Sequence, residues 1–539
     1  MQGAVHATEF IFLLLLLFVV VFGALAKRLS TPYPIVMVVG GLLLSFVPGI
    51  PRIVLNPDLI FLVILPPLLY SAAWVTSWRE FSYNFVSIFS LAFGLVTFTV
   101  IGVMEAVQWL LPGFDWRVGL VLGAIVAPTD AIAASSIARR VGLPKRIVDL
   151  LEGESLINDA SALLALEFGI ALLVEGTLPT FTGGLMRLFY LTAVGIAIGL
   201  VIGEFVHRIE HLVDDAPIEI TLSIVTPYIA YLAANSIRAS GVLAVVACGL
   251  YVSRKSSRFF SPGVRLQAWA VWESLTFILN GLVFVLIGLQ LPYVMSTIHD
   301  HNLRTLLAYG LGFSLFLVLL RLIWTFPGAY AASLIRRRAL HQKEPIPQLR
   351  QVFVVGWTGM RGVISLAAAI ALPQTLAGGV PFVQRNMIIF LAFTVILVTL
   401  VLQGLTLPPL IRSLGLAGAA KPDREEREAR RAIAQAALQH LEQVRDTHGA
   451  QFAEVYDDLA QHYQRRMATL AEGVELRELE ESTGAHRRFI EVSRDLLRVE
   501  RELALRLRNE RRISDELLRQ LEYELDLGEA QLLAKSQGN

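Results

Sequence analysis

Three carboxylates lie in residues 150–166, a stretch that is apolar enough to enter a bilayer. They belong to Glu152, Glu154 and Asp159. An ionisable side chain at membrane depth costs roughly 2.5–3.5 kcal/mol on insertion scales, so it is retained mainly where it faces a protein interior or an ion path. We therefore expect Asp159 to bind a cation and a proton alternately.

A second apolar stretch, residues 118–138, carries Pro128, Thr129 and Asp130 near its centre. Proline removes a backbone donor and clashes with the preceding turn, so we expect the helix to be interrupted at Thr129 and Asp130. Broken helices place free carbonyls and helix ends at mid-membrane, where secondary transporters build ion sites. A simple proline kink is the alternative, and the adjacent Asp130 favours the ion site.

The two stretches together predict an oxygen-lined cation site. On a helix, Ser155 and Asp159 are four residues apart and share a face, while Glu154 and Asn158 form the adjacent pair. The Ser155 hydroxyl, the Asp159 carboxylate and the Thr129 hydroxyl or carbonyl would suit a hard monovalent cation such as Na⁺ or K⁺. A buried Glu154 also needs a counter-ion.

A second broken span is expected within residues 351–377, where three glycines surround Arg361. Glycines weaken a helix and let a neighbour approach closely. Arg361 would be as costly to bury alone as Glu154, so we predict a structural ion pair between them. Arg321, in another apolar stretch, is a further buried charge to test.

The chain as a whole has the composition of a membrane protein, with 55% hydrophobic residues and a mean hydropathy of +0.60. The pattern predicts an all-α fold with thirteen transmembrane helices, which approximately cover 8–26, 33–49, 57–75, 84–111, 118–138, 148–174, 184–206, 217–237, 240–253, 267–292, 303–335, 351–377 and 386–411. The broken spans are the fifth and twelfth, and they correspond if spans one to six recur as eight to thirteen in an inverted repeat.

The charges predict the topology and a second region. Lys27 and Arg28 follow the first span, and Lys and Arg are concentrated in the loops on that side, which places the N-terminus outside and the C-terminus in the cytoplasm. Residues 1–416 would form the transmembrane domain. Residues 417–539 would form a charged, helical cytoplasmic tail, whose charges favour a solvated surface over a regulatory or dimerising role.

Several kinds of chemistry have no residues to support them. The single Cys248 excludes an internal disulfide and a thiolate metal cluster. The sequence contains no glycine-rich phosphate loop with its lysine, so ATP hydrolysis is not expected. We expect a transporter driven by an ion gradient, not an enzyme, with no cofactor and no nucleic-acid partner.

Three short segments resemble the signatures of a known family. Ala-Pro-Thr-Asp at 127–130, Gly-Glu-Ser-Leu-Ile-Asn-Asp at 153–159 and Gly-Met-Arg-Gly at 359–362 look like those of the sodium/proton exchangers among the cation:proton antiporters. The resemblance implies a thirteen-span inverted-repeat fold with two broken crossing helices, a core domain and a dimerisation domain. It also implies a homodimer in a bacterial-type inner membrane with a role in pH homeostasis.

The resemblance also implies roles for individual residues. Asp159 would be the exchanging carboxylate, surrounded by Asn158, Asp130, Thr129 and Ser155. Because Asn158 is neutral, the simplest cycle exchanges one proton for one cation without moving net charge.

One feature departs from the family pattern, and the cation remains open. Many relatives carry an acid shortly after the two prolines of the third span, but Pro66 and Pro67 are followed here by Ser71 and no nearby carboxylate. We expect exchange of sodium for protons, with potassium or lithium as further substrates. The alternatives are a potassium-selective exchanger, a non-transporting membrane sensor and, least favoured, a channel.

Overall fold

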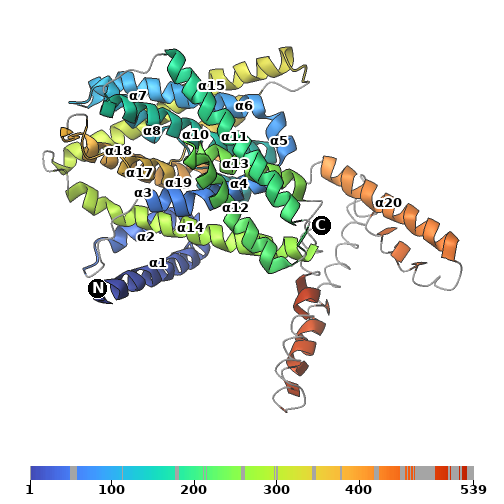
Figure 1. Cartoon of the computed structure of the whole chain (residues 1–539). Coiled ribbons are helices and arrows are strands. Elements are labelled where there is room, and N and C mark those ends of the chain that lie inside the picture. The colour runs from blue at the N-terminus through green and yellow to red at the C-terminus, as the bar shows by residue number, and fades with distance from the viewer. Residues whose placement is uncertain are drawn as a thin grey trace. The chain divides into compact units, whose positions relative to one another are not determined.

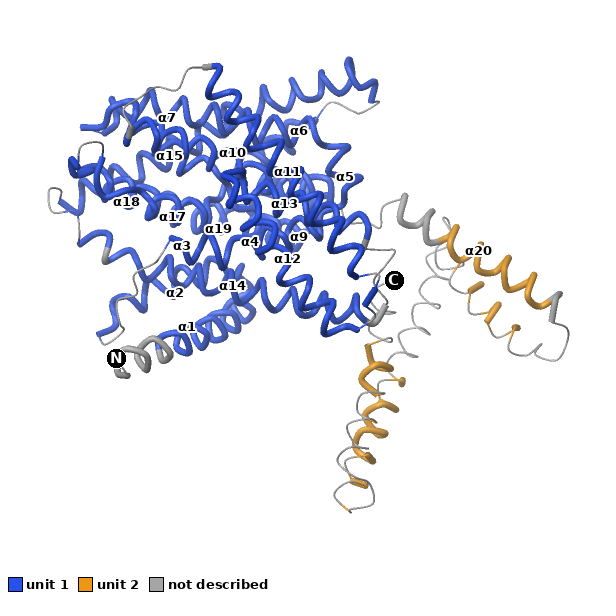
Figure 2. The backbone as a smooth tube through the Cα atoms, in the orientation of Figure 1, with its two compact units in different colours: residues 1–420 blue, residues 421–539 orange. Residues whose placement is uncertain are grey.

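The computed structural model describes residues 2–417 apart from 49–56, 112, 176–180, 211, 214, 257–261, 297, 299–301, 343–346 and 377–378, together with residues 424–448 and scattered positions of 456–530. Helices dominate the described residues, and their only β-structure is an isolated bridge between Thr375 and Pro381. The chain divides into a unit of residues 1–420 and a unit of residues 421–539 (Figure 2).

The helices of the first unit follow one another along the chain (Figure 1). In its first half these are α1 (Gln2–Arg28), α2 (Tyr33–Leu44), α3 (Pro57–Leu59), the π-helical η1 (Ile60–Ile64), α4 (Leu65–Val75), α5 (Trp78–Tyr83), α6 (Phe85–Phe89), the π-helical η2 (Ser90–Leu95), α7 (Val96–Leu110), α8 (Trp116–Val126), α9 (Ala131–Val141) and α10 (Lys145–Glu175). In its second half they are α11 (Phe181–Glu210), α12 (Ala216–Ser236), α13 (Gly241–Ser256), α14 (Pro262–Ser296), α15 (Leu303–Arg338), α16 (Leu349–Trp357), α17 (Val363–Ile370), α18 (Arg385–Val398), the π-helical η4 (Thr399–Gln403) and α19 (Gly404–Ser413).

Within the described residues, ten helical segments are long and apolar enough to cross a membrane. The other three predicted spans coincide with α2, which has 12 residues, with α13, which has 16, and with the interrupted pair α16 and α17. Every predicted span therefore overlaps a helix, although α2 ends at Leu44, before the predicted end of the second span at residue 49. The count of thirteen crossings remains a prediction.

The helix contacts repeat between the two halves of the unit. The predicted second span, α2, packs against α14 of the tenth, and α13 of the ninth packs against α4 of the third. Glycines allow both approaches: a Cβ on Gly288 would lie 2.2 Å from the Val38 carbonyl oxygen, and one on Gly249 would lie 3.1 Å from that of Tyr70. Likewise α7 packs against α8, and α15 against α16. These are the neighbour relations that an inverted repeat predicts.

Both predicted interruptions are present. Helix α8 ends at Val126 and α9 begins at Ala131, so the chain is non-helical around Pro128. Helix α16 ends at Trp357 and α17 begins at Val363. The Asp130 amide donates to the Met360 carbonyl over 2.8 Å, which joins the two breaks where they cross.

The second unit contains α20 (Arg424–His448), whose described side chains are mostly exposed. Farther along, Arg501 donates to Asp526 at 2.5 Å and to Glu529 at 3.0 Å. Gly449, Gly473 and Gly484, which the sequence suggests as helix breaks, lie outside the described residues.

Candidate functional site

A cavity of about 300 Å³ lies beside the crossing of the broken helices. Four of the predicted cation-binding residues line it: Thr129, Asp130, Ser155 and Asp159. The opposite walls come from α2, α4, α14 and α17, which contribute the polar side chains of Tyr33, Ser71, Thr276, Asn280 and Ser365. The serine that replaces the family's acid therefore faces the same space as Asp159.

Asp159 is the cavity carboxylate that has no hydrogen-bond donor among the residues that the structure describes. It is 6% exposed, and none of the hydrogen bonds among the described residues reaches its carboxylate. A buried carboxylate without donors is poorly stabilised as a bare anion. A proton or a cation is needed to neutralise it.

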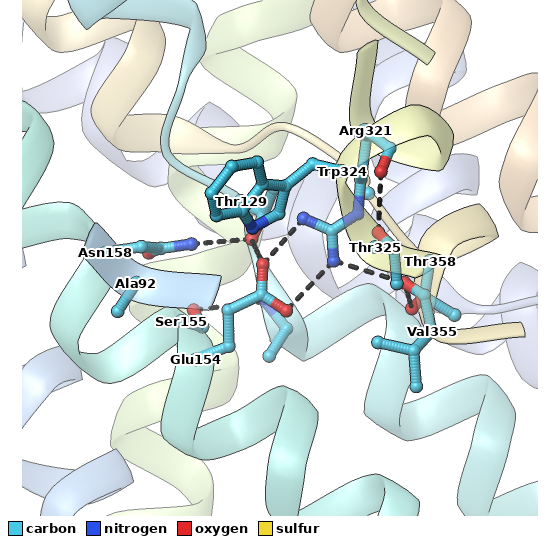
Figure 3. Close-up of polar contacts among 12 residues, drawn as sticks. Ala92, Thr129, Glu154, Ser155, Asn158, Arg321, Trp324, Thr325, Val355 and Thr358 are labelled. Carbon is cyan, nitrogen blue, oxygen red and sulfur yellow. Dashed lines mark hydrogen bonds and ion pairs between the residues drawn. The ribbon is translucent and has the colours of Figure 1, made fainter. Parts of the chain in front are cut away.

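The break around Thr129 is held by side chains from α10. Asn158 donates its amide to the Thr129 hydroxyl over 2.7 Å, and that hydroxyl donates to Glu154 Oε1 over 3.1 Å (Figure 3). The hydroxyl therefore accepts one hydrogen bond and donates another, so the Thr129 carbonyl is the oxygen of this residue that can bind a cation. The lining of the cavity does not include Asn158, so the contact observed for this residue is support of Thr129. The Ser155 hydroxyl accepts from the Ala131 amide over 3.2 Å.

The predicted ion pair between Glu154 and Arg361 is wrong. Glu154 receives two hydrogen bonds from Arg321 of α15, at 2.6 and 2.9 Å, and both side chains are 1% exposed (Figure 3). Arg321 also donates to the Val355 carbonyl over 3.2 Å. This two-pronged contact satisfies both carboxylate oxygens, which is the geometry that makes a buried arginine–carboxylate pair tolerable.

Arg361 instead compensates backbone carbonyls at helix ends. Its side chain donates to the carbonyl of Val126, the last residue of α8, over 2.7 Å, and to the carbonyl of Gly359. Its amide donates to the Thr399 hydroxyl over 3.0 Å. Carbonyls at helix C-termini lack intrahelical donors and carry partial negative charge, so a buried guanidinium stabilises them.

Asp130 occupies the complementary position at the helix N-termini. Its side chain caps α9 by accepting from the Ile132 amide over 2.8 Å. It also lies against Gly362, the residue before α17, where an added Cβ would be 2.4 Å from Asp130 Oδ2. A carboxylate here stabilises the partial positive charge of these helix starts.

Several residues of the site were not predicted from the sequence. The sequence marks Arg321 only as a buried charge, although an arginine in the middle of the 36-residue α15 requires a carboxylate partner. Asn280 and Ser365 line the cavity, and Asn280 Oδ1 and Ser365 Oγ have no partner among the described residues. Single polar residues in apolar helices give no sequence signal of which cavity they share.

The sequence matches known proteins along most of its length. The family described as "Sodium/hydrogen exchanger, transmembrane" matches residues 13–413. An uncharacterised Na⁺/H⁺ exchanger of Mycobacterium tuberculosis is 33% identical over 525 residues, covering 96% of this chain and 94% of the relative. A "Sodium, potassium, lithium and rubidium/H(+) antiporter" of Bacillus pumilus is 36% identical over 423 residues, covering 76% and 62%.

A solved structure shares the fold. The sodium proton antiporter MjNhaP1 of Methanocaldococcus jannaschii superposes with a TM-score of 0.59 at 18% identity, over 76% of this chain and 99% of that one. This similarity supports the helical antiporter architecture.

Proposed function

The chain belongs to the sodium/hydrogen exchanger family, and we propose that it exchanges sodium for protons, one for one, at Asp159. The observation that carries the proposal is the buried carboxylate of Asp159, which has no donor among the described residues, in a cavity beside two broken helices. As a member of a family of secondary transporters, the protein would be driven by ion gradients.

The exchange follows from the cost of burying a bare charge. The cation would be held by the Asp159 carboxylate, the Ser155 hydroxyl and the Thr129 carbonyl, with Asp130 nearby. When the cation leaves, a proton must take its place, because a bare carboxylate in a closed site is strongly disfavoured. The site therefore changes access only when it holds one or the other, and this couples the two fluxes.

The hydrogen bonds around the site favour a neutral cycle. Glu154 is committed to Arg321, Asp130 caps α9, and Asn158 cannot ionise. Glu152, which also lines the cavity, is paired with Arg139 at 2.8 Å, so only Asp159 then changes its charge state. One Na⁺ exchanged for one H⁺ moves no net charge.

The walls of the cavity suggest how access alternates. Asp130 and Asp159 belong to the broken helix α8–α9 and to α10, whereas Tyr33 and Asn280 belong to α2 and α14. Movement of the first group past the second would carry Asp159 from one side of the membrane to the other. We further propose a homodimer in the inner membrane, with the N-terminus outside and the C-terminus in the cytoplasm.

Potassium and lithium are second candidates for the cation. An oxygen-lined cavity of this volume does not by itself select sodium, and the Bacillus pumilus relative is named for four alkali cations. Purified protein in vesicles with an internal pH dye tests the proposal. Imposed Na⁺, K⁺ or Li⁺ gradients should drive proton flux, whereas choline should not.

Each alternative gives a different result in the same vesicles. A sensor would give no cation-driven proton movement at all. A channel would give cation uptake, followed with a sodium-sensitive dye, without stoichiometric proton movement. Either result would overturn the exchanger.

A further inference from the structure

A second cavity, of about 240 Å³, lies among α6, η2, α10, α15 and α16, apart from the cavity that contains Asp159. Its described lining includes two arginines, Arg146 and Arg336, and no carboxylate. Arg336 is only 5% exposed, although it lies two residues before Arg338, the last residue of α15. The remaining polar lining consists of Asn84, Ser87, Ser90, Thr325, Gln348 and Gln351. All of these can donate hydrogen bonds.

Two helices, α10 and α16, also start at this cavity. Helix α10 begins at Lys145 and α16 begins at Leu349, and residues of both first turns contribute to the wall. Gln348, the N-cap of α16, makes no side-chain capping bond. The first amides of a helix lack intrahelical acceptors and carry partial positive charge, so both helix starts add to the field of the two guanidinium groups.

We propose that this cavity binds a phosphate-bearing anion. Two arginines offer planar, paired donors that match phosphate oxygens, and the surrounding amides and hydroxyls can complete the shell. A cation would meet two positive side chains and no described carboxylate. The ligand could be a soluble phosphate compound or the headgroup of an anionic phospholipid, since both present the same chemistry.

Two residues that line the cavity connect it to the ion site. Thr325 and Val355 line the cavity, and both bond to Arg321: Val355 accepts from its guanidinium at 3.2 Å, and the Thr325 hydroxyl donates to its carbonyl at 2.6 Å. Arg321 in turn holds Glu154. An anion that shifts these residues therefore changes the support of the cation site, and the two ligands alter each other's affinity reciprocally.

The direct test is thermal unfolding of the full-length protein in detergent, in Tris phosphate against Tris chloride of equal ionic strength. Saturating phosphate should raise the Tm by about 3 °C or more. Arg336→Gln should weaken the response about tenfold in phosphate concentration, because it removes charge-assisted hydrogen bonds. Arg338→Gln is the matched control: this exposed arginine on the same helix is not among the lining residues, and its variant should respond like the wild type.

Two further variants keep the proposal testable if Arg336→Gln fails to fold. Arg336→Lys keeps the charge and should retain a partial response, and Arg146→Gln changes an exposed side chain and should weaken binding. Titration with dihexanoyl phosphatidylglycerol tests an anionic lipid as the ligand, with dihexanoyl phosphatidylcholine as the zwitterionic control. If the lipid binds more tightly than inorganic phosphate, the natural ligand is a phospholipid headgroup. If inorganic phosphate binds more tightly, the natural ligand is a soluble phosphate compound. The proposal is overturned if neither ligand raises the Tm of the wild type, or if Arg146→Gln and Arg338→Gln respond identically.

Discussion

Arg321 and Glu154 form a fully buried ion pair in which the guanidinium donates to both carboxylate oxygens, at 2.6 and 2.9 Å. Glu154 also accepts from the Thr129 hydroxyl, which lies in the break between α8 and α9. The pair thus ties α15 and α10 to the non-helical segment that lines the cation cavity. It supports the geometry of the site without facing the cavity, since neither residue lines it.

Removal of one member of this pair should destabilise the protein strongly. Glu154→Gln or Arg321→Gln alone leaves a buried charge without its partner, at a cost of about 3–5 kcal/mol in the free energy of unfolding. The double variant should recover part of that loss. Thermal unfolding of the purified proteins in detergent measures both effects.

An exposed ion pair provides the control for this experiment. Glu167 and Arg187 lie 2.9 Å apart with side chains 51% and 37% exposed. Glu167→Gln should therefore change stability by less than about 1 kcal/mol. If Glu154→Gln is as mild as this control, the buried pair is not the structural support described above.

Asp159→Asn should abolish exchange and leave a folded protein. Asparagine has nearly the same shape but can neither lose a proton nor neutralise a cation, and no described hydrogen bond depends on the Asp159 carboxylate. The measurement is cation-driven proton flux in reconstituted vesicles, together with thermal unfolding. Glu167→Gln, on the same helix but exposed, should transport at close to the wild-type rate. If Asp159→Asn keeps its flux, a different carboxylate must be the exchanging group.

The parts of this site that the sequence predicts are those with a local cause. Pro128 and the glycines around Arg361 act on their own helix turns, so both breaks fall where expected. The spacing of Ser155 and Asp159 fixes a shared helix face, and both line the cavity.

The wrong prediction concerns the partner of Glu154, which lies far from it in the sequence. Glu154 had two buried arginines available, Arg321 and Arg361, and helical spacing does not decide between them. The choice depends on the carbonyls at the helix ends, because the side chain of Arg361 is engaged by Val126 and Gly359. Arg321 of α15 bonds both the Val355 carbonyl of α16 and the Glu154 carboxylate of α10.

Gly362→Ala should damage the crossing of the broken helices. The added Cβ would lie 2.4 Å from Asp130 Oδ2 and 2.5 Å from Asp130 Cβ, so Asp130 must move from its capping position on α9. Overpacking of this kind costs typically 1–3 kcal/mol. We expect a lower Tm and loss of most of the cation-driven flux.

Gly312 of α15 is the matched control, because nothing lies within 4 Å of a Cβ added there. Gly312→Ala should leave flux unchanged and stabilise the helix by up to about 1 kcal/mol. Equal behaviour of the two alanine variants would contradict the close packing of Gly362 against Asp130.

Transport should not depend on membrane voltage. With Glu154 paired, Asp130 capping a helix and Asn158 neutral, the cycle carries one cation against one proton. An unmatched charge moved through 100 mV would contribute about 2.3 kcal/mol, so an electrogenic cycle would respond steeply. The sodium-driven rate in vesicles clamped with potassium and valinomycin should be the same at 0 mV and at about 100 mV, once potassium is shown not to be a substrate. A steep change would mean that a second carboxylate titrates, and loss of that voltage dependence in Asp130→Asn would identify Asp130 as the group.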